Sequence, residues 1–256
     1  MHKNIVINTN SDLTEDLLLK MISDFDHTGE LIGTGYRNVI KILNIGNKKY
    51  NIKSFKVPNL INKVVYNYFR QSKASRSYKY AENLLSKGIN TPMPVAYVEY
   101  KSLLTFNKSY YISEQLEYDF TIRKLIDEPL CDDYETILRE FTRFTFKLHE
   151  NNIHFLDHSP GNTLIKKVNG SYDFYLVDLN RMKFEKLTID ERLKNFARLS
   201  PKDYMLDIIS DEYATLINHP KEQVKERMYY FSLQFSSSFK KKEAFKKKYF
   251  FWRNKR

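Results

Sequence analysis

The chain has 256 residues, of which 42% are hydrophobic and 15% aromatic, which excludes a disordered protein and suits one large domain or two closely associated lobes. Its single cysteine, Cys131, excludes an internal disulfide and is typical of a reducing compartment. The formal net charge is +11, and residues 240–256 carry +8 of it. Because the charge is concentrated at one end, we expect a local electrostatic contact and no nucleic-acid surface spread over the fold.

The sequence contains no run of about 18 apolar residues, so no membrane-spanning helix is predicted. The first sixteen residues include Asp12, Glu15 and Asp16 and lack a long apolar core, so no signal peptide is predicted either. These features favour a cytoplasmic location.

The first half of the chain has the pattern of a strand-rich lobe. Predicted strands cover residues 30–43, 49–55, 95–101 and 109–114. The first two flank the turn signal Asn44-Ile45-Gly46-Asn47, which predicts a hairpin. Helices are predicted at 60–69 and 72–87, and the second ends at Gly88 before two prolines.

The second half is predominantly helical. Residues 133–151 place Ile137, Leu138, Phe141, Phe144 and Leu148 on one stripe, and further helices are predicted at 190–199, 202–218 and 221–235. Strands followed by helices predict a two-lobed α+β fold. We expect a small strand-rich lobe at 1–115, a helical lobe at 116–238 and a basic aromatic tail at 239–256.

The segment 149–178 carries the strongest chemical signal. Asp157 lies in a polar loop, Asn162 follows five residues later, and Asp178 closes an apolar strand predicted at 174–177. This spacing is typical of a kinase-like phosphotransferase, in which the first carboxylate orients and deprotonates the acceptor hydroxyl. The amide and the second carboxylate offer oxygen ligands to Mg²⁺ bound to the phosphates of ATP.

The histidines of this segment are predicted to be structural. His149 is expected to pack or hydrogen-bond at a helix end, and His154 to steady the loop from within the core. Without cysteines or further histidines at ligand spacing, no zinc site is predicted.

Three stretches, LHENNIHFLDHSPGNTLI, YLVDLNRMKF and SKGINTPMPVAY, resemble the lipopolysaccharide kinase (Kdo/WaaP) family, whose members share the protein-kinase fold. The resemblance extends from about Gly33 to Leu199. It implies an ATP- and Mg²⁺-dependent kinase that phosphorylates a sugar hydroxyl, of Kdo or heptose, on a lipopolysaccharide precursor at the cytoplasmic face of the inner membrane. It also implies that Asp157 is the catalytic base and that Asn162 and Asp178 are metal ligands.

The nucleotide-binding residues are less sharply defined. Lys53 lies in the strand after the hairpin turn, where a kinase holds its phosphate-binding lysine, and Lys56 is a close competitor. Glu82 is the acid available on the 72–87 helix to pair with that lysine, although the family comparison places the glutamate nearer position 77. Gly33 and Gly35 open a G-x-G-x-x-N loop whose backbone could approach phosphate oxygens.

Two departures bear on the acceptor. Asn180 stands where protein kinases have a glycine, and no A-P-E-like segment follows. Both argue against a protein substrate and favour a sugar. A kinase of another acceptor, either protein or small metabolite, and a nucleotide-binding pseudokinase remain as alternatives.

The tail combines lysines with aromatic residues. Phe245, Tyr249 and Trp252 follow one another at steps of four and three, as on one face of a helix. Such a helix suits an anionic membrane surface, or the anionic groups of a lipopolysaccharide precursor. A solvated, frayed terminus is the alternative interpretation, and RNA binding is disfavoured.

Overall fold

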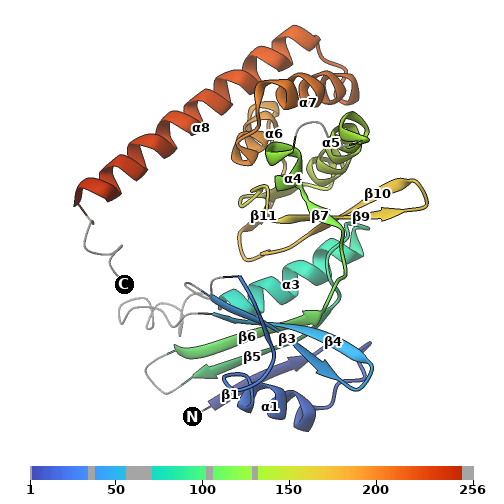
Figure 1. Cartoon of the computed structure of the whole chain (residues 1–256), viewed down its shortest axis with the longest axis vertical. Coiled ribbons are helices and arrows are strands. Elements are labelled where there is room, and N and C mark those ends of the chain that lie inside the picture. The colour runs from blue at the N-terminus through green and yellow to red at the C-terminus, as the bar shows by residue number, and fades with distance from the viewer. Residues whose placement is uncertain (1, 34–37, 56–70, 102–105, 129–131, 250–256) are drawn as a thin grey trace. The chain divides into compact units, whose positions relative to one another are not determined.

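The computed structural model describes residues 2–33, 38–55, 71–101, 106–128 and 132–249, and the chain forms two compact units (Figure 1). The first unit holds residues 1–117 and 175–180, and the second holds 118–174 and 181–256. The sequence put 175–180 in the second lobe. The structure assigns them to the first because Leu176 N donates to Asn90 O at 3.0 Å and Thr91 Oγ1 donates to Leu176 O at 2.7 Å.

The first unit is built on an antiparallel sheet with the strand order β1-β5-β6-β4-β3-β2 among the described residues. Its strands are β1 (His2–Ile7), β2 (Glu30–Ile32), β3 (Asn38–Ile45), β4 (Lys48–Phe55), β5 (Pro94–Lys101) and β6 (Phe106–Glu114). The predicted hairpin is β3–β4, with Gly46 at φ +60° in its turn. The predicted strand 30–43 is divided into β2 and β3 after Gly33, which has φ +74°.

Two elements near the N-terminus were not predicted. Every residue of β1 pairs with a residue of β5, and the two strands run antiparallel. α1 (Glu15–Ser23) begins at Thr14, whose hydroxyl accepts from Leu17 N, and it buries Leu18 and Met21. The N-terminal segment is therefore part of the folded core of the first unit.

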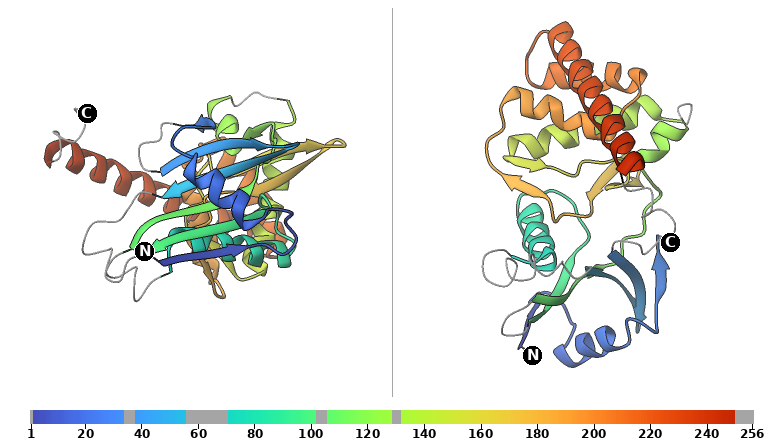
Figure 2. Two further views of the ribbon diagram at one scale, coloured as in Figure 1. Left: turned by 90° about the horizontal axis from the view of Figure 1, so that it is seen from below. Right: turned by 90° about the vertical axis from the view of Figure 1, so that its left-hand side faces the viewer.

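The helices of the first unit cover opposite faces of its sheet (Figures 1 and 2). Along β4, Tyr50 and Ile52 pack in the cluster that includes α1, whereas Phe55 packs with α3 (Lys73–Ser86). Because side chains alternate along a strand, Lys53 lies on the α3 face with Phe55. α3 confirms the helix predicted at 72–87, while the helix predicted at 60–69 lies outside the described residues.

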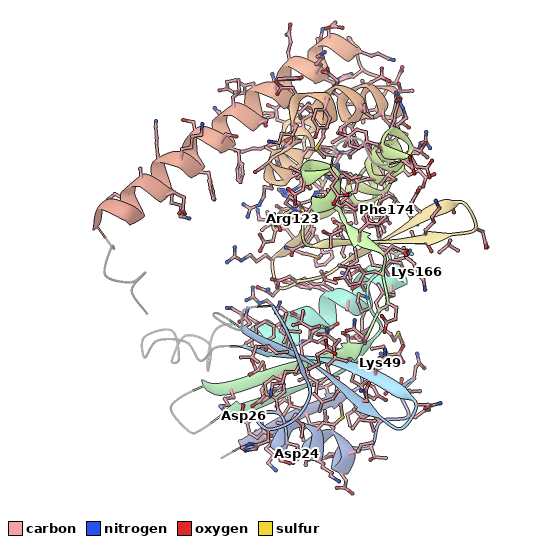
Figure 3. All side chains as sticks on the ribbon, viewed as in Figure 1. Asp24, Asp26, Lys49, Arg123, Lys166 and Phe174 are labelled. Carbon is pink, nitrogen blue, oxygen red and sulfur yellow. The ribbon has the colours of Figure 1, made fainter. Side chains whose placement is uncertain are left out.

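The second unit packs helices against short strands, as predicted for the helical lobe. Its elements in chain order are β7 (Phe120–Thr121), α4 (Ile122–Asp127), α5 (Tyr134–Glu150), β8 (Ile153–Phe155), β9 (Thr163–Val168), β10 (Ser171–Leu176), β11 (Met182–Phe184), α6 (Ile189–Phe196), the 3₁₀ helix η1 (Ala197–Leu199), α7 (Asp203–Leu216) and α8 (Lys221–Tyr249). The last two residues of β10 belong to the first unit. The apolar stripe of α5 forms the centre of its core, with Phe141 and Leu138 completely buried. Phe174, labelled in Figure 3, packs on Phe144 of that helix at a ring distance of 5.5 Å.

α8 is longer than the helix predicted at 221–235, so the predicted tail begins inside it. Its first half packs on α6 and α7 and buries Val224 and Met228. Leu233, Phe239 and Phe245 are exposed, and Leu233 is 70% exposed. No helix of the described chain has a stretch apolar enough to cross a bilayer.

Two histidines belong to the aromatic core of the second unit. The ring of His158 lies 5.3 Å from that of Phe141 and 5.7 Å from that of Phe155. His149 Nδ1 lies 2.7 Å from the hydroxyl of Tyr213. Burial lowers the pKa of His158 to about 4 and that of His149 to about 3, so both rings are neutral in the folded protein at neutral pH.

His158→Phe should reduce the acid sensitivity of the fold. Below about pH 6.5 the unfolded chain takes up a proton on His158, whereas the folded chain does so only near pH 4, so the stability that this histidine contributes is present above pH 6.5 and falls as the pH is lowered. Between pH 7 and 5.5 the wild type should lose about 1 kcal/mol more unfolding free energy than the variant, measured by urea denaturation. His27→Gln, at an exposed position, should keep the wild-type pH dependence. An unchanged pH dependence in His158→Phe would show that the ring is not buried neutral.

Candidate active site

In the first unit, Lys53 of β4 forms an ion pair with Asp178, with Nζ 2.7 Å from Oδ1. The lysine side chain is 11% exposed, and its Nζ also lies 5.4 Å from the centroid of the Phe55 ring. A largely buried ammonium group needs an anionic partner, and the Asp178 carboxylate is that partner. Lys53 therefore lies in the predicted strand with its ammonium group held by Asp178, and its role in phosphate binding stays a prediction.

Asp178 follows the end of β10, in the segment 175–180 that belongs to the first unit. Its φ is +58°, in the left-handed region that is uncommon for residues other than glycine. Asn180 Nδ2 donates to Asp178 Oδ1 at 2.5 Å, so the same oxygen contacts Lys53 and Asn180. No hydrogen bond of the described residues involves Asp178 Oδ2, which is therefore the carboxylate oxygen open to a ligand.

The structure pairs Lys53 with a different acid from the one predicted. Glu82 is exposed on α3, one helical turn after the buried Tyr78. Burial raises the pKa of the Tyr78 phenol, and Glu82, which accepts its hydrogen bond, raises it further. Among the described residues, the ion-pair partner of Lys53 is Asp178.

The glycine loop is only partly described. Gly33 has φ +74°, and a Cβ added to it would meet no atom within 4 Å, so the backbone conformation is what favours glycine there. Gly35 and Lys56 lie outside the described residues. The choice between Lys53 and Lys56, and the phosphate contact of the two glycines, stay predictions.

In the second unit, the loop between β8 and β9 brings Asp157 and Asn162 together. The main-chain oxygen of Asp157 accepts from Asn162 Nδ2 at 2.8 Å and from Ser159 N at 2.7 Å. Asn162 N in turn donates to Ser159 O at 2.9 Å. The five-residue spacing thus closes a compact loop. Because Nδ2 of Asn162 makes the hydrogen bond that closes it, the amide oxygen of Asn162 is not part of that bond.

The Asp157 carboxylate contacts two arginines that sequence reasoning missed. Arg198 Nη2 donates to Oδ1 at 3.0 Å, and Arg181 Nη1 lies 3.8 Å from Oδ2. Arg198 belongs to η1 and Arg181 precedes β11, so both contacts come from tertiary structure. Since neither arginine is near Asp157 in sequence, no local pattern identifies them.

His154 is less deeply buried than predicted, and His158 lies in the core next to Asp157. Along β8, Ile153 and Phe155 are buried, so the alternating position of His154 is only half-buried. His158 follows Asp157 directly and is completely buried between aromatic rings, which anchors the loop from within the core. His149 is a core histidine that lies within hydrogen-bond distance of its neighbours, as predicted.

Each of the two predicted metal ligands carries an oxygen atom of the type that Mg²⁺ binds. No group of three histidine, cysteine, aspartate or glutamate side chains that could hold a metal is found in the part of the chain that the structure describes. Mg²⁺ usually binds one or two carboxylates and completes its shell with water and phosphate oxygens. Asp178 in the first unit has one carboxylate oxygen of this kind, and Asn162 in the second unit has an amide oxygen of this kind.

Comparison with known proteins identifies the family. The model of the lipopolysaccharide kinase (Kdo/WaaP) family matches residues 29–225. The chain belongs to this family. The match includes the Asp157 loop and both residues of the Lys53–Asp178 pair, and it begins after β1 and α1. The family resemblance inferred from the sequence is therefore confirmed.

A solved structure shares the fold over nearly the whole chain. The protein described as "WaaP in complex with acyl carrier protein" has a TM-score of 0.63 at 13% sequence identity, covering 93% of this chain and 98% of that chain. The predicted kinase-like α+β fold is thus confirmed. No curated protein matched this sequence.

The Lys53–Asp178 pair should show strong energetic coupling. Asp178→Asn leaves the nearly buried ammonium of Lys53 without a carboxylate, and Lys53→Met leaves the partly buried Asp178 without a cation. Each variant should lower the free energy of unfolding by about 1–3 kcal/mol. The double variant should lose less than the sum, with a coupling of roughly 1–2 kcal/mol in urea unfolding. The exposed pair Lys48–Asp12 serves as the control, and its coupling should be much weaker because solvent screens both charges. Additive effects at Lys53 and Asp178 would contradict the pairing.

Proposed function

We propose that this protein transfers the γ-phosphate of ATP to a sugar hydroxyl, of Kdo or heptose, in the inner core of a lipopolysaccharide precursor. Family membership makes the protein an ATP-using phosphotransferase. The observation that supports the finer proposal is the geometry of the candidate residues: Lys53 is paired with Asp178, and Asn162 closes the loop that carries Asp157.

Each of these residues has a chemical role in the proposed reaction. Lys53 binds the phosphates of ATP through its ammonium group, and Asp178 and Asn162 supply oxygen ligands to Mg²⁺. When bound, Mg²⁺ neutralises charge on the phosphates. The acceptor oxygen forms a bond to the γ-phosphorus while the bond from that phosphorus to the leaving oxygen of ADP breaks. Asp157 receives the proton of the acceptor hydroxyl.

In the proposed reaction, Lys53 and Asp178 exchange their contact with each other for contacts with the bound nucleotide and its metal ion. Lys53 gains phosphate oxygens and Asp178 gains a cation, so each loses its neighbour and finds a replacement. A pseudokinase could bind nucleotide through the same exchange, and turnover distinguishes the two.

We further propose that the protein acts at the cytoplasmic face of the inner membrane, bound through the C-terminal part of α8. Lys240, Lys241 and Lys242 are exposed there, and each basic residue near an anionic surface contributes about 1 kcal/mol. Leu233, Phe239 and Phe245 follow at intervals of six residues, so the exposed apolar side chains of the described helix lie on different sides of it. This arrangement favours electrostatic attraction over insertion of one apolar face.

The proposed reaction is tested by incubating labelled ATP and Mg²⁺ with a Kdo-bearing lipid A precursor. The wild type should transfer label to the glycolipid, and Asp157→Ala should reduce transfer by about 100-fold or more because the acceptor hydroxyl loses its base. Binding of ATP should be nearly unchanged in that variant. As a matched control, Asp173→Ala removes a carboxylate from β10 and should retain activity. ATP binding without label on any glycolipid would shift the assignment to another acceptor or to a pseudokinase.

The membrane proposal is tested with a charge variant that keeps the helix. Replacing Lys240, Lys241 and Lys242 by glutamine should reduce sedimentation with anionic liposomes, and 0.5 M salt should reduce that of the wild type in the same way. Transfer to a soluble sugar acceptor should be unchanged. Equal sedimentation of the two proteins would show that these lysines do not mediate membrane binding.

A further inference from the structure

The carboxylate of Asp157 lies between two guanidinium groups, Arg181 and Arg198, which we call the guanidinium pair. They differ in how firmly they are held. Arg198 hydrogen-bonds Oδ1 at 3.0 Å and is 38% exposed, whereas Arg181 lies 3.8 Å from Oδ2, beyond hydrogen-bond distance, and is 61% exposed. Arg198 is thus hydrogen-bonded to the carboxylate, whereas Arg181 lies near it without a hydrogen bond.

Arg198 is anchored by a second element of its unit. Its guanidinium lies 5.8 Å from the centroid of the Phe235 ring on α8, and η1 packs against that helix. Its Nε is buried and has no hydrogen-bond partner among the described residues. Packing against an aromatic ring restricts the guanidinium plane, so Arg198 orients Oδ1 and fixes the rotation of the carboxylate.

While Arg198 holds Oδ1 of Asp157, the other carboxylate oxygen, Oδ2, can accept a proton. No described hydrogen bond reaches Oδ2, so it is the oxygen available to the acceptor hydroxyl. Arg181 lies beside this oxygen, and a third guanidinium is close to the same loop: a Cβ on Gly161 would be 3.7 Å from Arg123 Nη2. Figure 3 shows Arg123 on the second unit. A hydroxyl delivered to Oδ2 therefore enters a positively charged environment.

We propose that the guanidinium pair selects an acceptor whose reacting hydroxyl lies near a carboxylate or a phosphate. Arg181 leaves Asp157 and binds the anionic group of the acceptor, while Arg198 stays on Asp157 as its positioning residue. The net charge around Asp157 favours this exchange, because one carboxylate faces two guanidinium groups. This inference rests on the proposed function, since it assigns the acceptor-binding residues of that reaction.

The test for Arg181 uses two pairs of soluble competitors against phosphorylation of the Kdo-bearing glycolipid. One pair is the methyl glycoside of Kdo and its methyl ester, and the other is heptose 7-phosphate and heptose. With the wild type, the charged member of at least one pair should inhibit at about tenfold lower concentration. Arg181→Gln should abolish this difference, and Arg181→Lys should restore part of it.

A matched control separates Arg181 from a general loss of charge. Arg143 is 56% exposed and, like Arg181, is an arginine near a carboxylate, that of Glu212. Arg143→Gln should preserve the preference for the charged competitor. Equal inhibition by both members of both pairs, or a preference that survives in Arg181→Gln, would overturn the proposal. Absence of glycolipid phosphorylation in the wild type would instead overturn the proposed function itself.

The positioning role of Arg198 has a distinct kinetic signature. Arg198→Gln should lower kcat about tenfold with the glycolipid while leaving the KM for ATP unchanged, because Asp157 loses its orientation and nucleotide binding does not. Arg198→Lys should recover part of kcat. A change confined to the KM for the acceptor would show that Arg198 binds the sugar and does not position Asp157.

Discussion

Lys53 and Asp178 are 125 residues apart in the chain, yet Nζ and Oδ1 meet at 2.7 Å. The contact depends on the β4 register, which turns Lys53 toward the α3 face, and on the hydrogen bonds that dock the segment after β10 beside Asn90 and Thr91. A largely buried charge is tolerated only with a partner. Phosphate can replace the carboxylate for Lys53, and a divalent cation can replace the ammonium for Asp178. A metal-bound nucleotide offers both replacements at once, so the pair suits a protein that binds one.

In the second unit, Asp157 is held in place while one of its carboxylate oxygens has no hydrogen bond among the described residues, as the proposed role of a base requires. The loop that Asn162 closes fixes the main chain of Asp157, and Arg198 fixes one carboxylate oxygen. Phe235 restrains Arg198 from α8, the helix that continues into the basic C-terminal segment. The proposed base and the proposed membrane-binding helix are thus connected through a single arginine, within one compact unit.

Local sequence patterns predicted much of this fold and part of its site. The β3–β4 hairpin, α3 and α5 follow from a turn signal, a capped helix and an apolar stripe, each of which is contained in a short segment. β1 escaped prediction because it forms by pairing with β5, whose residues come much later in the chain, from His2 opposite Lys101 to Ile7 opposite Ala96. Arg181 and Arg198 escaped for the same reason, since only tertiary structure brings them to Asp157. Asp178 escaped prediction as the ion-pair partner of Lys53 because the two residues are 125 positions apart in the chain.

The central proposal is that Asn162 and Asp178 each supply an oxygen ligand to the Mg²⁺ that arrives with ATP. The most direct measurement is the NMR signal of the Asn162 side-chain amide in ¹⁵N-labelled protein with a non-hydrolysable ATP analogue and Mn²⁺, a paramagnetic substitute for Mg²⁺. The account predicts that this signal broadens strongly with Mn²⁺ and the nucleotide together, that it stays sharp with Mg²⁺, and that Asp178→Asn weakens the broadening. An Asn162 signal that stays sharp while nucleotide and Mn²⁺ are bound would contradict the account.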